Sequence, residues 1–265
     1  MQSLKNAKLF LFDMDGTLYL GDNLFPFTKE LLSTIREKGG KYLFLTNNSA
    51  KSVADYVLKL KKLGIDSCED DFLTSSQATA FYLKKHNKND RLYVCGTESF
   101  KKELVKEGFV VAESVEETDC IVMGNDQELT FKKLHDISYL LLTRKDIPYI
   151  ATNPDYVCPT EFGSVPDCGS ICDMLYNVSG RRPVFVGKPE PLMPILAMEK
   201  AGCESFETVV VGDRIYTDVK SGLNAGTLTV LVMSGETTKE ILEASPDKPR
   251  YVFESAEAIL NLLNE

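Results

Sequence analysis

Two aspartates, Asp13 and Asp15, stand one residue apart directly after four large apolar residues in the stretch LFLFDMDGTLY. An uninterrupted apolar run of this kind is typical of a parallel strand covered on both faces, and Gly16 suits the chain as it leaves that strand. Both carboxylates would then lie at the carboxyl edge of a sheet, where open α/β sheets bind their ligands. The pair therefore predicts a ligand-binding or catalytic edge.

Other polar residues follow apolar runs in the same way. Thr46 and Asn47 end the run KYLFLTNN, Lys188 follows RRPVFVG, and Asp213 follows ETVVVG, with Asp218 five residues later. Each of them alone has an ordinary explanation as a turn residue, a helix cap or a solvated loop residue. Together, carboxylates, a lysine and a hydroxyl at one sheet edge are the groups needed to hold a hard cation beside a phosphate.

The segments that must position these residues alternate between short apolar runs and amphipathic stretches, which predicts β-α units stacked around a parallel sheet. ELLSTIREKGG predicts a helix that stops at Gly39 and Gly40. The spacing of Ser52 and Asp55 predicts a capping box, ahead of a helix that Gly64 closes. The middle of the chain carries its own strand and helix patterns, so we expect an inserted α/β domain at residues 80–180 and a main domain formed by residues 1–79 and 181–265.

Composition limits the classes of function. The chain has 265 residues, 43% of them apolar and 26% charged, which is typical of an ordered globular protein. The N-terminus lacks an apolar signal core, no apolar run approaches the roughly 18 residues that span a bilayer, and seven cysteines without a C-x-x-C pair favour reduced thiols. We therefore expect a cytoplasmic protein. The net charge of -9 argues against nucleic acid or an anionic membrane as a partner.

The stretches DMDGTLY, LTNN, VGKP and VGDRIYTD resemble, in order and context, the four motifs of the haloacid dehalogenase (HAD) superfamily phosphatases. The resemblance extends over nearly the whole chain. The large insertion with ATNPD inside it is similar to that of the NagD-like and p-nitrophenyl phosphatase subfamily. This resemblance implies a doubly wound parallel-sheet core with an inserted α/β cap domain. It also implies Mg²⁺-dependent hydrolysis of small phosphate monoesters, such as sugar phosphates, nucleoside monophosphates or p-nitrophenyl phosphate.

The same resemblance assigns roles to the motif residues. Asp13 is expected to be the nucleophile that forms an aspartyl-phosphate, and Asp15 the residue that gives and takes protons. Mg²⁺ is expected to bind the Asp13 carboxylate, the Asp15 backbone carbonyl and the Asp213 carboxylate. Asp218 would orient a metal-bound water or Lys188. The residues expected to bind the phosphate group are Gly16, Thr46, Asn47 and Lys188.

The alcohol part of the substrate is expected to be recognised by the inserted domain, through the loop Asn153–Ile171. This loop has Asp167 where relatives usually have a glycine, and its other polar or aromatic candidates include Asp155, Tyr156, Thr160 and Glu161. The partner is expected to be a small phosphorylated metabolite, and the sequence leaves a monomer or a homodimer open. Two alternatives also stay open, namely a phosphotransferase or mutase of the same superfamily and a phospho-receiver module without turnover.

Overall fold

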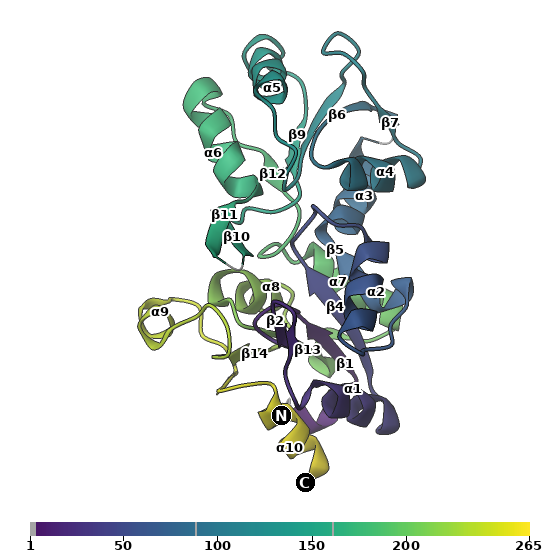
Figure 1. Cartoon of the computed structure of the whole chain (residues 1–265), viewed down its shortest axis with the longest axis vertical. Coiled ribbons are helices and arrows are strands. Elements are labelled where there is room, and N and C mark those ends of the chain that lie inside the picture. The colour runs from purple at the N-terminus through teal and green to yellow at the C-terminus, as the bar shows by residue number, and fades with distance from the viewer. Residues whose placement is uncertain (1–3, 88, 161) are drawn as a thin grey trace. The chain divides into compact units, whose positions relative to one another are not determined.

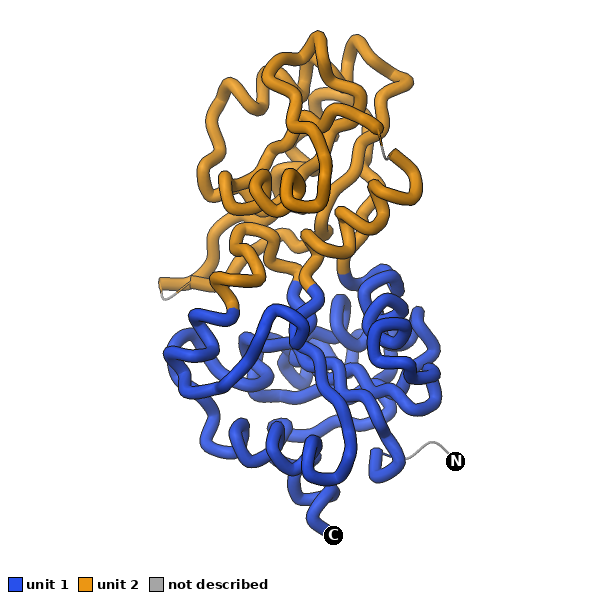
Figure 2. The backbone as a smooth tube through the Cα atoms, turned by 90° about the vertical axis from the view of Figure 1, so that its right-hand side faces the viewer, with its two compact units in different colours: residues 1–46, 57–73, 188–265 blue, residues 47–56, 74–187 orange. Residues whose placement is uncertain are grey.

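The structure is a computed structural model that describes residues 4–87, 89–160 and 162–265. The chain forms two compact units, coloured separately in Figure 2. The core unit comprises Met1–Thr46, Val57–Leu73 and Lys188–Glu265, and the inserted unit comprises Asn47–Tyr56 and Thr74–Gly187. The expected insertion, residues 80–180, lies within the inserted unit, whose ranges are wider because helix α3 (Ser75–His86) packs against α4 (Glu98–Lys106).

A six-stranded sheet forms the centre of the core unit, in the order β15-β14-β13-β1-β4-β5 (Figure 1). Strand β1 (Leu9–Phe12) lies in the middle and runs parallel to both of its neighbours. All residues of β1, β13 and β14 are buried, as expected for strands covered on both faces. The expected doubly wound α/β core is therefore confirmed. The other strands of this sheet are β4 (Lys41–Thr46), β5 (Phe72–Thr74), β13 (Thr208–Gly212), β14 (Leu228–Val232) and β15 (Tyr251–Phe253).

Helices pack on this sheet in two groups. Helix α1 (Thr28–Glu37) packs against α10 (Glu257–Asn264), while α7 (Leu192–Ala201) packs against β1, β4 and α8 (Lys220–Asn224). Helix α1 ends where the sequence predicts, since Gly39 adopts a positive φ of 78°. The remaining elements of the core unit are a hairpin of β2 (Tyr19–Leu20) and β3 (Asn23–Leu24), η1 (Leu4–Asn6), η2 (Glu69–Asp71), η3 (Ser205–Glu207), the π-helix η4 (Ile215–Val219) and α9 (Lys239–Ala244).

Helix α2 (Val53–Lys62) begins in the inserted unit and ends in the core unit. The predicted capping box is confirmed, because the Ser52 backbone N–H donates to Asp55 Oδ2 (2.9 Å) and the Asp55 N–H donates to Ser52 Oγ (3.3 Å). Gly64 follows the helix with a φ of 78°. Among the described residues, no helix is long and apolar enough to cross a membrane.

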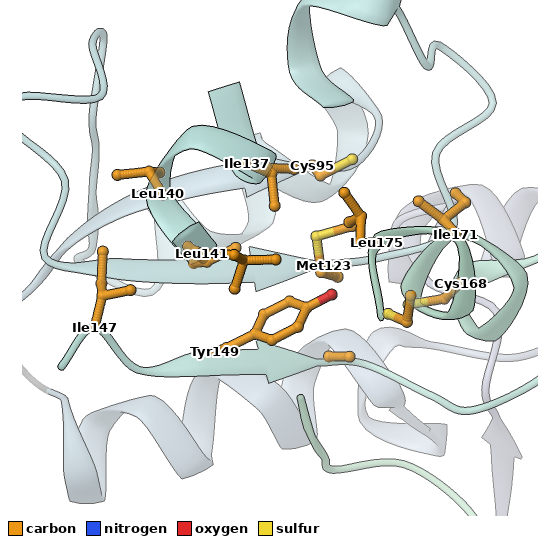
Figure 3. Close-up of a cluster of buried hydrophobic side chains, with 13 residues drawn as sticks. Cys95, Met123, Ile137, Leu140, Leu141, Ile147, Tyr149, Cys168, Ile171 and Leu175 are labelled. Atoms are coloured by element: carbon orange, nitrogen blue, oxygen red, sulfur yellow. The ribbon is translucent and has the colours of Figure 1, made fainter. Parts of the chain in front are cut away.

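The inserted unit has its own five-stranded sheet in the order β12-β9-β8-β6-β7. Helices α5 (Phe131–Thr143) and α6 (Cys168–Ser179) pack against each other, and their buried side chains meet the sheet around Met123 and Tyr149 (Figure 3). Cys168 and Cys172 belong to this apolar core, and all seven cysteines are free. The strands of the unit are β6 (Arg91–Cys95), β7 (Val110–Val111), β8 (Cys120–Met123), β9 (Tyr149–Ala151) and β12 (Val184–Phe185), and a separate hairpin pairs β10 (Val157–Thr160) with β11 (Gly163–Pro166).

The placement of β12 corrects one expectation. The apolar run before Lys188 was expected to be a strand of the main sheet, but β12 pairs with β9 in the sheet of the inserted unit. The next two residues continue this pairing, since the Val186 N–H donates to the Ala151 carbonyl (3.0 Å) and the Gly187 N–H to the Thr152 carbonyl (2.8 Å). Lys188 is therefore the first residue of the chain's return to the core unit, and the strand directly before it, β12, belongs to the sheet of the inserted unit.

Candidate active site

The register of the core sheet brings the first motif residues to one edge. Phe12 lies level with Phe44 on β4 and with Val211 on β13. Because Asp13 follows β1 and Asp213 follows β13, their positions differ by only one residue along neighbouring parallel strands. Thr46 ends β4 on the other side of β1. The structure thus places Asp13, Thr46 and Asp213 at the carboxyl edge at which the sequence places them.

Lys188 joins this edge through its side chain. Its ammonium donates to Asp13 Oδ1 (2.7 Å), to Asp218 Oδ1 (2.6 Å) and to the Leu45 backbone carbonyl (3.3 Å). The side chains of Lys188 and Asp218 are 3% and 1% exposed, so these are desolvated ion pairs. Burial lowers the pKa of Lys188, but the carboxylates of Asp13 and Asp218 outweigh it and hold that pKa above its usual value. Lys188 is therefore a fixed positive charge.

Three carboxylates gather around this lysine. Asp13, Asp213 and Asp218 each have an oxygen within 4.8 Å of the others. Asp213 Oδ2 accepts the Glu236 N–H (2.7 Å), whereas its Oδ1 atom is buried and accepts no hydrogen bond from the described part of the chain. A buried carboxylate oxygen without a donor is costly unless a cation approaches it. These residues therefore fit a hard divalent cation such as Mg²⁺, which prefers oxygen ligands.

Two glycines pack against Asp213. A Cβ on Gly16 would lie 2.6 Å from Asp213 Oδ2. The φ of 82° at Gly16 is also a backbone conformation that residues other than glycine rarely adopt. A Cβ on Gly235 would lie 2.0 Å from the same oxygen. Gly16 was predicted at the site for close backbone approach, whereas Gly235 was missed because no motif residue stands next to it in the sequence.

The carboxylate cluster carries unbalanced negative charge. Burial, together with Asp218, raises the pKa of Asp13 to about 6, although Lys188 acts in the opposite direction. Burial, followed by the charges of Asp13 and Asp218, raises the pKa of Asp213 to about 8. Both shifts run opposite to those of a carboxylate in a balanced ion pair. The cluster is therefore arranged to gain from an added positive charge.

Asp15 lies apart from this cluster. Its side chain is 42% exposed, and its Oδ2 atom lies 3.9 Å from the ammonium of Lys59 on helix α2. Its Oδ1 atom accepts the backbone N–H of Gly21, in the β2–β3 hairpin, at 3.5 Å. An exposed carboxylate two residues after the buried Asp13 is suited to exchange protons with a substrate and with water. Lys59 is a second residue that the motifs did not reveal.

Asn47 belongs to the inserted unit, directly after Thr46. Its amide donates to Asp155 Oδ2 (3.1 Å), which also accepts from Asn153 Nδ2 (3.2 Å). Its backbone carbonyl accepts from the Ser75 hydroxyl (2.6 Å). These contacts fix the position of Asn47. A role for Asn47 in phosphate binding stays a prediction.

The loop Asn153–Ile171 buries two of the residues that were candidates for substrate recognition. Asp155 and Asp167 are 5% and 3% exposed, so neither is presented on the surface of the inserted unit. Asp167 is the N-cap of α6 and accepts from the Cys168 N–H (2.6 Å), which gives it a structural role. The Asp167 carboxylate is therefore engaged within the inserted unit, and a role for Asp167 in substrate recognition stays a prediction. The exposed side chains of the loop include Tyr156 (59%) and Phe162 (82%), while Glu161 lies outside the described residues.

Arg214 is a further residue at the site, and the sequence motifs assigned no role to it. Its backbone N–H donates to Asp218 Oδ2 (3.1 Å), and its positive charge lowers the pKa of both Asp13 and Asp213, though less than burial raises it. Its Nε atom pairs with Glu236 Oε2 (2.8 Å), next to the N–H that binds Asp213. The π-helix η4 that follows turns Asp218 back toward the cluster, and such helices are frequent at functional sites.

Comparisons with known proteins are consistent with this geometry. A family model described as haloacid dehalogenase-like hydrolase matches residues 10–110, and a second HAD-hydrolase-like model matches residues 185–259. The chain is 34% identical to the 5'-nucleotidase YutF of Bacillus subtilis, over 95% of this chain and 97% of that protein. It is also 34% identical to the acid sugar phosphatase of Staphylococcus aureus, over 98% and 99%. A 4-nitrophenylphosphatase from Thermotoga maritima has 41% identity and a TM-score of 0.93, with 98% of each chain covered.

Proposed function

Because this chain belongs to the haloacid dehalogenase-like hydrolase family, as a NagD-like phosphoric monoester hydrolase, we propose that it cleaves small phosphate monoesters with Mg²⁺ through an aspartyl-phosphate on Asp13. The observation that supports this most directly is the buried Lys188 ammonium between Asp13 and Asp218, beside the unsatisfied Asp213 oxygen. Phosphoryl transfer of this kind uses a nucleophilic carboxylate, a fixed positive charge and carboxylate oxygens that can bind a cation.

In the proposed first step, an Asp13 oxygen forms a bond to phosphorus while the bond from phosphorus to the leaving oxygen breaks. Asp15 gives its proton to that oxygen, so the alcohol leaves neutral. In the second step, Asp15 takes a proton from a water molecule whose oxygen attacks phosphorus, and the bond to Asp13 breaks. The products are inorganic phosphate and a regenerated Asp13 carboxylate.

The main barrier to the first step is the approach of two anions. Two unit charges about 4 Å apart repel by roughly 4 kcal/mol at an effective dielectric of about 20. The Lys188 ammonium offsets part of this, and Thr46 is proposed to donate its hydroxyl to a phosphate oxygen. Asp13 and Asp213, with the Asp15 carbonyl, would hold Mg²⁺, and Asp218 would orient Lys188. The bound metal would supply positive charge to the phosphate group.

The proposed substrates follow the chemistry of the relatives, which are a 5'-nucleotidase, an acid sugar phosphatase and a 4-nitrophenylphosphatase by name. The direct test is a panel of sugar phosphates, nucleoside monophosphates and p-nitrophenyl phosphate, assayed with Mg²⁺. We expect one inorganic phosphate released for each ester consumed. A deficit of free phosphate would indicate transfer to another acceptor, as in a mutase, and phosphorylation without turnover would indicate a receiver module.

The leaving group is proposed to be selected by the loop Asn153–Ile171, whose Phe162 is 82% exposed. Phe162→Ala should change the ranking of the panel by kcat/KM, by several-fold between bulky and small esters, since a lost apolar contact is worth roughly 1–3 kcal/mol. Phe131→Ala is the matched control, because Phe131 is 81% exposed in the same unit but lies at the start of α5. An unchanged ranking in Phe162→Ala, or an equal change in both variants, would contradict this assignment.

We further propose that the protein acts in the cytoplasm on a small phosphorylated metabolite, without nucleic acid or membrane as a partner. The free cysteines and the net charge of -9 support this proposal. Light scattering would show whether the protein is a monomer or a homodimer.

A further inference from the structure

Lys59 occupies an unusual environment for a lysine. Its side chain is only 21% exposed, although Lys61 and Lys62 on the same helix are exposed to solvent. Its ammonium lies 4.2 Å from the centroid of the Tyr19 ring and 3.9 Å from Asp15 Oδ2. A cation over an aromatic face is attracted to it, and more strongly where water is partly excluded. The ammonium thus has an aromatic and an anionic contact at once.

Both contacts belong to one turn of the chain. Asp15 and Tyr19 begin and end the D-G-T-L-Y segment, and their backbones form an isolated β-bridge. The Gly16 backbone N–H donates to the Tyr19 carbonyl (2.7 Å), which closes the turn. Tyr19 is 1% exposed, so its ring is a fixed platform. A charge resting on this ring has a defined position relative to Asp15.

Lys59 itself is carried by a well-anchored helix. The capping box of Ser52 and Asp55 fixes the start of α2, and Asp55 also accepts from the Ser99 hydroxyl (3.3 Å). The opposite side of the Asp15 carboxylate meets the Gly21 N–H at 3.5 Å. Asp15 is therefore flanked by a backbone donor and a side-chain cation, both held by neighbouring structure.

From this arrangement we propose that Lys59 is a positioning residue that fixes the Asp15 carboxyl group for proton transfer to the leaving group. The inference rests on the proposed function, because it needs Asp15 to act as that proton donor. Small losses of alignment at a reacting group can be costly, and a misplacement of 1 Å can lower a rate by about 10²-fold. Neither the motifs nor the roles assigned from them include Lys59.

The test uses two substrates that differ in their need for a proton. p-Nitrophenolate leaves as a stabilised anion, whereas an alkoxide must be protonated as it leaves. In Lys59→Met, we expect kcat/KM for the alkyl phosphate that the wild-type protein hydrolyses fastest to fall about tenfold relative to kcat/KM for p-nitrophenyl phosphate. Since kcat/KM reports the step that phosphorylates Asp13, the later hydrolysis of the intermediate does not enter this ratio.

Two further variants sharpen the result. Lys59→Arg keeps the charge over Tyr19 and should restore the ratio to within about threefold of wild type. Lys61→Met removes an exposed charge from the same helix and should leave the ratio unchanged. The proposal is overturned if Lys59→Met slows both substrates equally, leaves both unchanged or accelerates the alkyl ester. If the wild-type protein hydrolyses neither substrate, the proposed function fails instead, so the two failures are distinguishable.

Discussion

Asp13→Asn should reduce hydrolysis of every substrate to near background, a loss on the order of 10³-fold or more, because an amide oxygen cannot form the covalent intermediate. The variant should still fold. Its side-chain oxygen can accept from Lys188 as Asp13 Oδ1 does at 2.7 Å, and the substitution removes one charge from a crowded anionic cluster. A loss of activity without a fall in the melting temperature would therefore show that the variant has lost chemistry and not its fold.

Asp15→Asn provides the comparison for this prediction. It leaves Asp13 able to attack but removes proton transfer, which is typically worth 10²- to 10⁴-fold. Phosphate from a labelled substrate should be trapped on wild-type protein as an acyl-phosphate that hydroxylamine cleaves, and mass spectrometry should map it to Asp13. A stable phosphoserine or phosphohistidine, or full activity in Asp13→Asn, would contradict the proposed nucleophile.

Sequence patterns predicted the parts of the site that depend on parallel strands. Asp13, Thr46 and Asp213 each follow a buried apolar run, and neighbouring parallel strands must end at a common edge. The pairing Phe12 with Phe44 and with Val211 confirms that logic. Local patterns were sufficient here because the position of a residue at the end of a parallel strand also determines the edge of the sheet at which it lies.

Patterns failed where a contact depends on tertiary structure. The run before Lys188 reads like any buried strand, and nothing in it tells which of two sheets it joins, so β12 was assigned to the wrong one. Asp167 reads as a loop residue, but its carboxylate caps α6 and is 3% exposed. The sequence does not distinguish Lys59 from Lys61 and Lys62. What sets it apart is its contact with Asp15 and Tyr19, which are 40 residues or more away in the sequence.

The second large effect expected is from metal removal. EDTA should abolish hydrolysis of p-nitrophenyl phosphate and added Mg²⁺ should restore it, because Asp13, Asp213 and Asp218 form an anionic cluster with a buried oxygen that lacks a donor. Ca²⁺ should inhibit, since its looser and larger coordination would misplace the attacking oxygen. Asp213→Asn should lose activity at ordinary Mg²⁺ concentrations. Hydrolysis at the full rate in EDTA would rule out the metal site.

The same cluster predicts how stability depends on pH when no metal is present. The folded protein holds the pKa of Asp13 at about 6 and that of Asp213 at about 8, both above the ordinary value of 3.8 for an aspartate. A raised carboxyl pKa contributes stability that is fully present below pH 4 and is lost as the pH rises through about 6 to 8. In EDTA, the melting temperature should therefore decline over that range by at least several degrees, since one pKa unit corresponds to about 1.4 kcal/mol.

Mg²⁺ should reverse most of that decline, because a bound cation compensates the charges that folding brings together. Asp213→Asn should flatten the decline in EDTA and abolish the Mg²⁺-induced rise in melting temperature, whereas Asp66→Asn, at an exposed position in the same unit, should change neither. Melting curves at pH 5 and pH 8.5 with EDTA or Mg²⁺ separate these outcomes without any activity assay. If Mg²⁺ raised the melting temperature equally in Asp213→Asn, the ion would be binding elsewhere, and Asp213 would have no part in holding it.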